Sequence, residues 1–383
     1  MFRRAAQISD YCILDSEPEH RLSQFERLTL TGGDELSKAL DWVSKQINSV
    51  KLIKPQDSLD LQVLKASLES YFASQDLKRP YAEVSSTPLV TEHPVHGLPD
   101  GEVVDLIFES PYQAKRACLD SYLDSLAENK HCRVRLWRHA APAKATMVAL
   151  HGWTMGDQRL NSLAFLPGLF YRAGLDVALV ELPLHGRRKG RGAGADPSML
   201  LAGNPCLVNE VMEQVILELR GLRAYLESCG SREIGCIGMS LGGYCAALWA
   251  ALDELSFCVP IVPLSSMSEL AWKVLSRKFG PQRLRQAGFC AKKLRDLFSR
   301  HNPTNYRAAT ARERMLFIGG KGDKIVSARH PRRLAKHWDG ARVVWLEGGH
   351  AALTQSLKAL EKAIDFLIER GVVSESAREL LKT

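Results

Sequence analysis

The sequence of 383 residues lacks the features that mark several classes of protein. No apolar run reaches the roughly 18 to 20 residues that a membrane-spanning helix needs. The first residues, MFRRAAQISDYCILDSEPEHR, contain no apolar core of a secretory signal, so we expect a cytoplasmic protein. There is no internal repeat and no low-complexity tract. With 45% hydrophobic and 25% charged residues, the composition is that of a soluble globular protein.

Metal-binding cysteine patterns are also missing. The nine cysteines are scattered, and none forms a CxxC pair. An odd number cannot pair completely within one chain, and most lie in apolar surroundings, where a reduced thiol behaves as a small hydrophobic group. We therefore expect reduced cysteines and no zinc site.

The first part of the chain has helical periodicity. Apolar residues recur at helical spacing across residues 34–77, in two series: Leu36, Leu40, Val43 and Ile47, then Leu61, Leu64, Leu68 and Tyr71. Residues 85–102 are rich in proline, serine and glycine, which predicts a loop. We place a mostly helical extension at residues 1–95 and the main domain at residues 96–383.

The main domain alternates short apolar runs with long helical patterns. The strongest helical patterns cover residues 209–230 and 354–371. The runs that we expect to be strands are residues 102–110, 131–139, 145–153, 175–186, 233–243, 257–265, 314–323 and 341–350. Buried strands alternating with helices predict an α/β fold with a mostly parallel, doubly wound sheet that is covered on both faces. Ligands of such sheets bind beyond the carboxyl ends of the strands.

Ser240 lies where one predicted strand turns sharply into a helix. Gly238 and Gly242 flank it in the pattern GMSLG, the G-x-S-x-G pattern of a nucleophile elbow. Such a corner needs small neighbours, because larger side chains would clash with the adjoining strand or helix. The pattern alone is weak, since a glycine-rich turn can also bind a phosphate or nothing. We predict that Ser240 is a catalytic nucleophile.

A serine hydroxyl needs a base, and the base needs an orienting acid. His350 follows the last predicted strand, after Gly348 and Gly349, and Asp323 directly follows the strand before it. Loop histidines and aspartates are common, so each residue alone could be structural. Together they stand in the chain order Ser, Asp, His at strand ends that we expect to share one edge of the sheet.

Negative charge that develops on a carbonyl oxygen is stabilised by backbone amides. We expect one amide from Leu241, which follows the serine, and one from Trp153 in the sequence His151-Gly152-Trp153. His151, like His185 after the next strand, is more readily explained as a hydrogen-bonding residue of its own loop than as a base.

With these residues, the chain resembles the α/β-hydrolase superfamily over residues 100–375, through the motifs HGW, GMSLGG, GGKGD and GGHAAL. It also resembles, more loosely, a little-studied subgroup of α/β-hydrolase domain-containing proteins. The resemblance implies a Ser240–His350–Asp323 triad, oxyanion donors at Trp153 and Leu241, an acyl-enzyme intermediate and no cofactor. The sequence Leu182-Pro183-Leu184-His185-Gly186 departs from the aspartate-led loop of many relatives, so their substrates are not transferred to this chain.

An insertion at about residues 265–305 is predicted to form a helical cap. Within it, residues 273–300 contain nine basic residues and a single acid, Asp296; the basic residues are Lys273, Arg277, Lys278, Arg283, Arg285, Lys292, Lys293, Arg295 and Arg300. A solvated helical face is the favoured interpretation, and an anionic acyl substrate or a membrane surface is the alternative. A second basic loop covers residues 187–191 and favours the alternative slightly. The net charge of +8 permits anionic partners, but no nucleic-acid-binding module is present.

The predicted activity is hydrolysis of a carboxylic ester or thioester, with a small acyl ester as substrate. Acyl transfer or peptidase action would use the same triad, and a catalytically silent binding protein on this fold is the alternative outside the enzymes. The sequence does not define the acyl chain, the leaving group, the oligomeric state or the role of the N-terminal extension.

Overall fold

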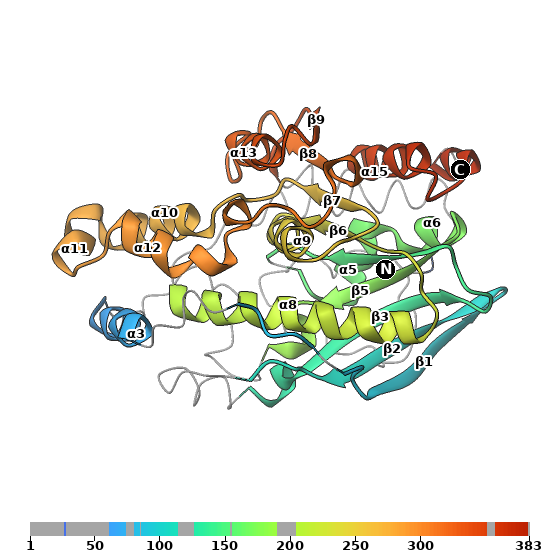
Figure 1. Cartoon of the computed structure of the whole chain (residues 1–383), viewed down its shortest axis with the longest axis horizontal. Coiled ribbons are helices and arrows are strands. Elements are labelled where there is room, and N and C mark those ends of the chain that lie inside the picture. Colours follow the sequence, from blue (N-terminus) through green and yellow to red (C-terminus); the bar gives the residue numbers. More distant parts are fainter. Residues whose placement is uncertain are drawn as a thin grey trace, which may run out of the picture.

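The computed structural model describes residue 27 and residues 61–73, 80–84, 86–113, 126–153, 155–189, 204–350 and 357–381. These residues build one sheet with helices on both of its faces (Figure 1). Its strands are β1 Val90–Leu98, β2 Gly101–Glu109, β3 His131–His139, β4 Ala145–Leu150, β5 Leu175–Glu181, β6 Ile234–Met239, β7 Cys258–Ile261, β8 Leu316–Gly320 and β9 Arg342–Leu346. The α-helices are α3 Leu61–Ala73, α5 Gln158–Phe165, α6 Pro167–Arg172, α8 Pro205–Ser228, α9 Leu241–Leu252, α10 Met267–Phe279, α11 Pro281–Gln286, α12 Ala291–Leu297, α13 Arg329–His337 and α15 Leu357–Glu369.

The sheet has the strand order β1-β2-β3-β5-β4-β6-β7-β8-β9. Neighbouring strands are antiparallel from β1 through β3 to β5, and parallel from β5 to β9. The eight predicted strands are all present, and the predicted mostly parallel α/β sheet is confirmed. Because the strands from β5 to β9 run in one direction, their carboxyl ends lie along one edge of the sheet.

Each face of the sheet packs against its own set of helices. In β4, Val148 and Leu150 point into a core with α8 and α9, whereas Met147 and Ala149 point into a second core with α6 and α15. Strand β4 is buried at every position, since side chains on both of its faces are covered. This explains why its sequence is a continuous apolar run instead of an alternating one.

Strand β1 corrects one prediction. Proline and glycine indicate a loop over residues 85–102, but residues 90–98 form the edge strand and pair antiparallel with β2. The register shifts between Pro94 and His96, and an edge strand tolerates a proline because one side of its backbone has no partner strand. The sheet therefore begins at Val90, on the N-terminal side of the boundary that we predicted between residues 95 and 96.

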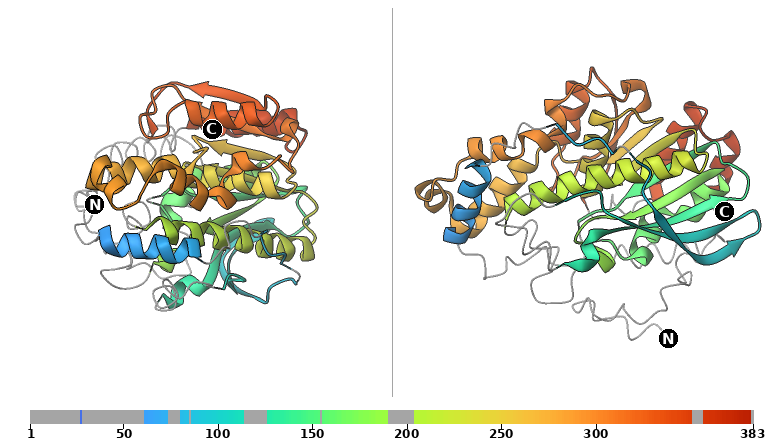
Figure 2. Two further views of the ribbon diagram at one scale, coloured as in Figure 1. Left: turned by 60° about the vertical axis from the view of Figure 1, so that its left-hand side comes forward. Right: turned by 60° about the horizontal axis from the view of Figure 1, so that its bottom comes forward.

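The described part of the N-terminal extension is helix α3, while the helical pattern over residues 34–60 lies outside the described residues. Leu64, Leu68 and Tyr71 of α3 are buried. The Tyr71 hydroxyl donates to Glu210 of α8 and accepts from the Asn209 amide, at 2.8 and 2.6 Å. Helix α3 therefore packs on the N-terminal half of α8, as both views in Figure 2 show.

Three helices, α10 to α12, follow β7 and precede β8, where the sequence predicted a cap. They extend from the body of the molecule beyond one edge of the sheet (Figure 1). Helix α8 runs antiparallel to the strands and begins on this same side, so the edge is the one at which the parallel strands end.

Candidate active site

Ser240 occupies the sharp turn between β6 and α9. Its backbone has φ 55° and ψ −108°, a conformation that few non-glycine residues adopt. A Cβ atom at position 238 would lie 2.1 Å from the Gly242 carbonyl oxygen, and one at position 242 would lie 1.9 Å from that of Leu150. Both distances are far inside van der Waals contact, so the turn requires glycine at both positions, for the steric reason that the sequence suggested.

Three side chains from distant parts of the chain meet at this turn. The His350 Nε2 atom lies 2.8 Å from the Ser240 hydroxyl oxygen, and its Nδ1 atom lies 2.6 Å from the Asp323 carboxylate. These residues follow β6, β8 and β9, whose carboxyl ends share one edge of the sheet. The structure thus brings together the serine, the histidine and the aspartate that the sequence singled out.

The Asp323 carboxylate is held from two sides. Its second oxygen accepts hydrogen bonds from the backbone amides of Ile325 and Val326, each at 2.8 Å. The side chain is fully buried, and that of His350 is only 12% exposed. A carboxylate oxygen in contact with Nδ1 favours the imidazole tautomer that carries its proton on Nδ1, and the Nε2 lone pair then faces the Ser240 hydroxyl.

The two candidate oxyanion donors border the serine. Leu241 is the first residue of α9, so its amide has no acceptor within the helix. A Cβ atom on Gly152 would lie 3.8 Å from the Ser240 Cβ atom, which places the loop of residues 151–153 beside the serine. Trp153, next in this loop, is 9% exposed.

His151 and His185 are buried and hydrogen-bonded within their loops. His151 Nδ1 donates to the Gly152 carbonyl, and its Nε2 accepts from the Leu182 amide, at 2.8 and 3.0 Å. His185 Nδ1 donates to the Pro183 carbonyl at 2.8 Å. Burial lowers the pKa of His151 well below its usual range and that of His185 to about 4. Both rings are therefore neutral at neutral pH and hold the loops that follow β4 and β5.

The basic loop after β5 is not an anion-binding surface in its described part. Arg188 is fully buried and forms an ion pair with Glu218 at 2.6 Å. Arg187 pairs with Glu181 at 2.7 Å, and a second carboxylate, that of Asp105, lies 3.5 Å away. These arginines neutralise buried acids, so they do not supply the second basic surface that the sequence suggested.

A second serine–histidine pair was missed in the sequence. The Ser265 hydroxyl lies 3.0 Å from His330 Nδ1, between the end of β7 and the start of α13. Glu269 in the first turn of α10 forms ion pairs with Arg329 and Arg333 of α13, at 2.8 and 2.5 Å. The two contacts fasten the base of the cap to the helix that follows the Asp323 loop. Isolated serines and histidines give no sequence signal for such a pair.

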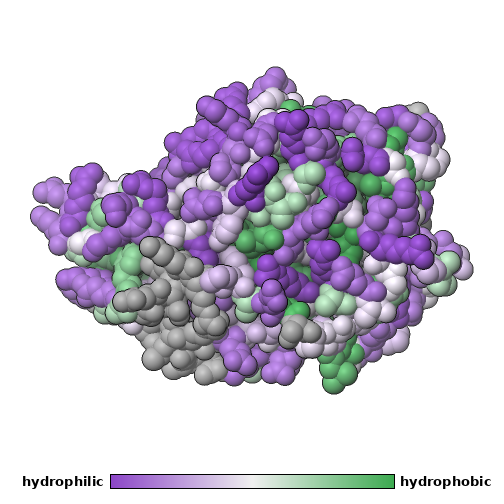
Figure 3. All heavy atoms as spheres, viewed as in Figure 1, coloured by the Kyte–Doolittle hydropathy of each residue, from purple (hydrophilic) through white to green (hydrophobic). Residues whose placement is uncertain are grey.

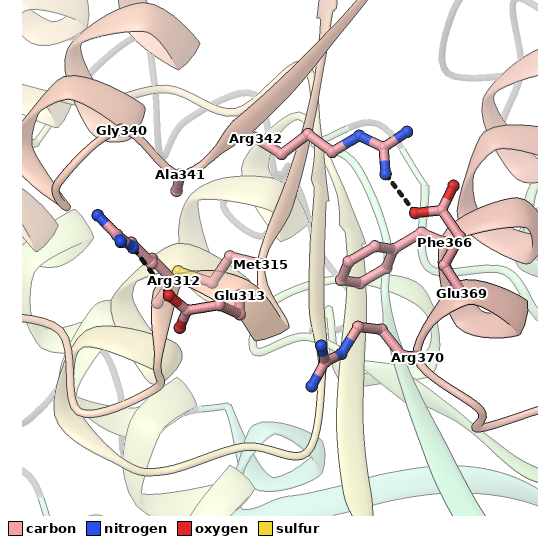
Figure 4. A pocket seen from close by; sticks show the side chains of 9 residues that line it. All are labelled: Arg312, Glu313, Met315, Gly340, Ala341, Arg342, Phe366, Glu369 and Arg370. Atoms are coloured by element: carbon pink, nitrogen blue, oxygen red, sulfur yellow. Dashed lines mark hydrogen bonds and ion pairs between the residues drawn. The ribbon is translucent and has the colours of Figure 1, made fainter.

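A pocket of about 420 Å³ lies at the other edge of the sheet (Figure 4). Its lining includes residues that precede β8 and β9, whereas the triad residues follow strand ends. The Arg342 side chain pairs in it with Glu369, and the Arg312 side chain with Glu313. This pocket is therefore separate from the triad, and surface ion pairs already engage two of its cations.

The described residues contain no cluster of three or more histidine, cysteine or acidic side chains that would suit a metal ion. The seven cysteines among them are free thiols, and five are buried. None of the helices in the described segments is both long and apolar enough to span a membrane.

No protein-family model matches the chain. Over 329 residues it is 26% identical to uncharacterized protein Rv2627c of Mycobacterium tuberculosis. The aligned region covers 83% of this chain and 76% of that protein. Among solved structures, it is similar to acetyl xylan esterase 1 from Thermoanaerobacterium sp. JW/SL YS485, at a TM-score of 0.49 and 15% identity, over 82% of this chain and 99% of that one. It is also similar to alpha/beta hydrolase GrgF from Penicillium sp. sh18, at a TM-score of 0.42 and 13% identity. That match covers 63% of this chain and 94% of the GrgF chain.

The topology of this chain defines its class. The sheet begins with antiparallel strands, places β5 before β4, and continues as a parallel series up to β9. A serine lies at the turn from β6 into α9. The chain has the α/β-hydrolase fold, as its motifs predicted.

Proposed function

We propose that this protein is a serine hydrolase that cleaves a carboxylic ester or thioester through an acyl-enzyme. The observation that supports the proposal most directly is the chain of hydrogen bonds from Ser240 through His350 to Asp323, at 2.8 and 2.6 Å. Three residues of the required types, in the required order, share one strand edge. A silent binding protein would have no need of the strained backbone at Ser240.

In the first half of the reaction, the Ser240 oxygen attacks the carbonyl carbon while His350 Nε2 takes the hydroxyl proton. The amides of Leu241 and Trp153 stabilise the oxyanion of the tetrahedral intermediate. His350 then gives its proton to the leaving alcohol or thiol, and the acyl group stays on Ser240. Water attacks this ester in the second half, again with His350 as base, and releases the acid.

Asp323 stays ionised throughout. Its carboxylate holds the imidazole in the productive tautomer and stabilises the imidazolium that forms at each proton transfer. Acyl transfer to another alcohol or amine, and peptidase action, use the same steps with a different nucleophile or leaving group.

The test uses a fluorophosphonate probe and a panel of esters and thioesters that differ in acyl chain and leaving group. The probe should label the wild-type protein at Ser240, and Ser240→Ala should abolish both labelling and turnover. The loss should be at least about a thousandfold, because no other group replaces the nucleophile.

The matched control is Ser265→Ala, which removes the other serine that bonds a histidine at this edge. It should keep its labelling at Ser240. If Ser240→Ala retains most of the activity, or if the folded wild-type protein does not react with the probe, the proposed function is wrong.

A further inference from the structure

The outer surface of the cap carries cations that pair with no carboxylate in the described part of the chain. Five exposed side chains form what we call the cap cation face; they are Arg277, Arg283, Arg285, Lys293 and Arg295. No ion pair or side-chain hydrogen bond engages any of them among the described residues. Asp296, the one acid of α11 and α12, is bonded to Lys292 at 3.0 Å. The buried Arg300, which the sequence grouped with these residues, pairs with Glu213 instead.

Some exposed cations elsewhere in the described chain have a carboxylate partner. Arg312 pairs with Glu313 and Arg314 with Glu254, each at 2.8 Å, and the Arg342 side chain is bonded to Glu369. The contrast is local, because α11 and α12 supply cations with a single acid between them. The cap thus carries a local excess of positive charge, since most of its exposed cations pair with no carboxylate among the described residues.

The inner surface of the cap is occupied by the protein itself. Leu275, Leu284, Phe289 and Leu294 are at most 2% exposed and join the hydrophobic core on the α8 side of the sheet. Since the apolar stripe is packed inward, the cations point away from the molecule. Hydrophilic side chains cover the projecting end of the cap in Figure 3.

Two aromatic side chains of α10 are half-buried, and one of them lies beside a lysine. Trp272 and Phe279 of α10 pack only partly against the core, and the Lys278 ammonium group lies 5.5 Å from the Phe279 ring centroid. Aromatic rings next to lysine and arginine are typical of segments that rest at a lipid–water interface.

The position of the cap relates this surface to the triad. The cap projects from the edge at which β6, β8 and β9 end, and Ser240 lies at that edge (Figures 1 and 2). A flat anionic surface in contact with α11 and α12 would therefore face the edge of the sheet that holds the serine.

We propose that the cap cation face docks the protein on the surface of a phospholipid bilayer that contains anionic lipids. The choice of lipid over another polyanion rests in part on the proposed ester hydrolysis, because membrane lipids are acyl esters. Each lysine or arginine near such a surface contributes about a fivefold gain in affinity. The attraction is electrostatic, so it weakens as salt screens the charges.

The experiment measures sedimentation of the full chain with phosphatidylcholine vesicles, with and without phosphatidylserine. Wild type should bind only the vesicles that contain phosphatidylserine, and it should be released by high salt. The variant Arg283→Gln, Arg285→Gln, Lys293→Gln should lose on the order of a hundredfold in partitioning. Its melting temperature and its hydrolysis of a soluble ester should stay at the wild-type level, since these side chains are exposed and bond nothing.

The matched control, Arg312→Gln, Arg314→Gln, Arg342→Gln, removes the same charge from the opposite edge of the sheet. It should bind vesicles within about threefold of wild type. Equal loss in the two variants, or equal binding to neutral vesicles, would overturn the proposal. The proposal would also be wrong if the protein bound a DNA duplex through the cap cations and did not bind the vesicles.

Ser240→Ala separates this proposal from the proposed function. It should bind anionic vesicles as wild type does, because docking does not involve the nucleophile. Vesicle binding by a wild-type protein that the probe does not label would contradict the proposed serine hydrolase and support the docking surface. Labelling without vesicle binding would support the hydrolase and contradict the docking surface.

Discussion

Two serine–histidine pairs among the described residues at the carboxyl edge of the sheet have nearly the same separation and different surroundings. Ser240 lies 2.8 Å from His350, and Ser265 lies 3.0 Å from His330. Behind the His350 ring stands the carboxylate of Asp323. His330 contacts its serine through Nδ1, whereas in His350 the Nδ1 atom contacts the aspartate and Nε2 contacts the serine.

Electrostatics separates the two histidines further. Burial lowers the pKa of His330 to about 4, and the nearby cations Arg329, Arg333 and Lys273 lower it too, although Glu269 opposes them. A base with so low a pKa takes a serine proton poorly. Ser265 is also completely buried, whereas Ser240 is only partly buried and has a strained backbone.

The comparison shows what the proposed catalysis needs in addition to a serine close to a histidine. A nucleophile needs an accessible corner, and its base needs a negative partner on the far side of the ring. The first pair has both features. Ser265 is buried, and no carboxylate among the described residues is hydrogen-bonded to the His330 ring, so we interpret the second pair as a fastening between the cap and α13.

The largest expected effect follows from removing the charge behind His350. Asp323→Asn keeps an oxygen that can accept from the Ile325 and Val326 amides, but its amide group would favour the wrong imidazole tautomer. We expect kcat/KM to fall by about 10⁴-fold, with unfolding stability near wild type. Labelling rates with the fluorophosphonate probe measure this without knowledge of the substrate. A fall of less than tenfold would mean that Asp323 does not orient His350.

An intermediate effect concerns the contribution of His330 to the loss of stability at low pH. Its pKa is lowered on folding, so between pH 6.5 and 4 the unfolded chain binds more protons and stability falls as the pH falls. Wild type should lose stability between pH 7 and pH 4.5, and in His330→Gln this loss should be smaller by up to about 2 kcal/mol. Urea unfolding at the two pH values measures the difference.

The control for that measurement is His337→Gln, an exposed histidine at the end of the same helix. It should leave the loss between the two pH values unchanged. An identical loss in wild type and His330→Gln would show that His330 is not the group that titrates.

The smallest expected effect comes from the serine of the second pair. Ser265→Ala removes the hydrogen bond to His330 and a longer one from Arg333, so it should lower the free energy of unfolding by about 1 kcal/mol. Its kcat/KM should stay within about twofold of wild type, since the hydroxyl contacts no residue of the proposed triad. A hundredfold loss of activity with unchanged stability would place Ser265 in the catalytic machinery.

Local sequence patterns predicted the parts of this protein that depend on neighbours in the chain. Continuous apolar runs identified β4 and β6, because strands covered on both faces need no polar side. The flanking glycines identified the turn at Ser240, since their steric role lies within a few residues of it. Strand β1 was missed because a proline that is acceptable at a sheet edge looks like a loop signal.

Charge shows the limit of such patterns. Arg188 and Arg283 both stand in basic segments, yet the first is buried against Glu218 and the second is exposed without a partner. Their partners, or the lack of them, come from parts of the chain that lie far away in sequence. Composition alone therefore cannot separate a structural ion pair from a docking surface.

The sequence by itself determined the alternation of strands and helices, the glycine-flanked corner and the order of serine, aspartate and histidine. Only the tertiary structure decided which histidine stands between a serine and a carboxylate, and which cations stay unpaired. The physical reason is range: backbone sterics and apolar periodicity act over a few residues, whereas hydrogen bonds and ion pairs depend on which strand ends the fold brings together.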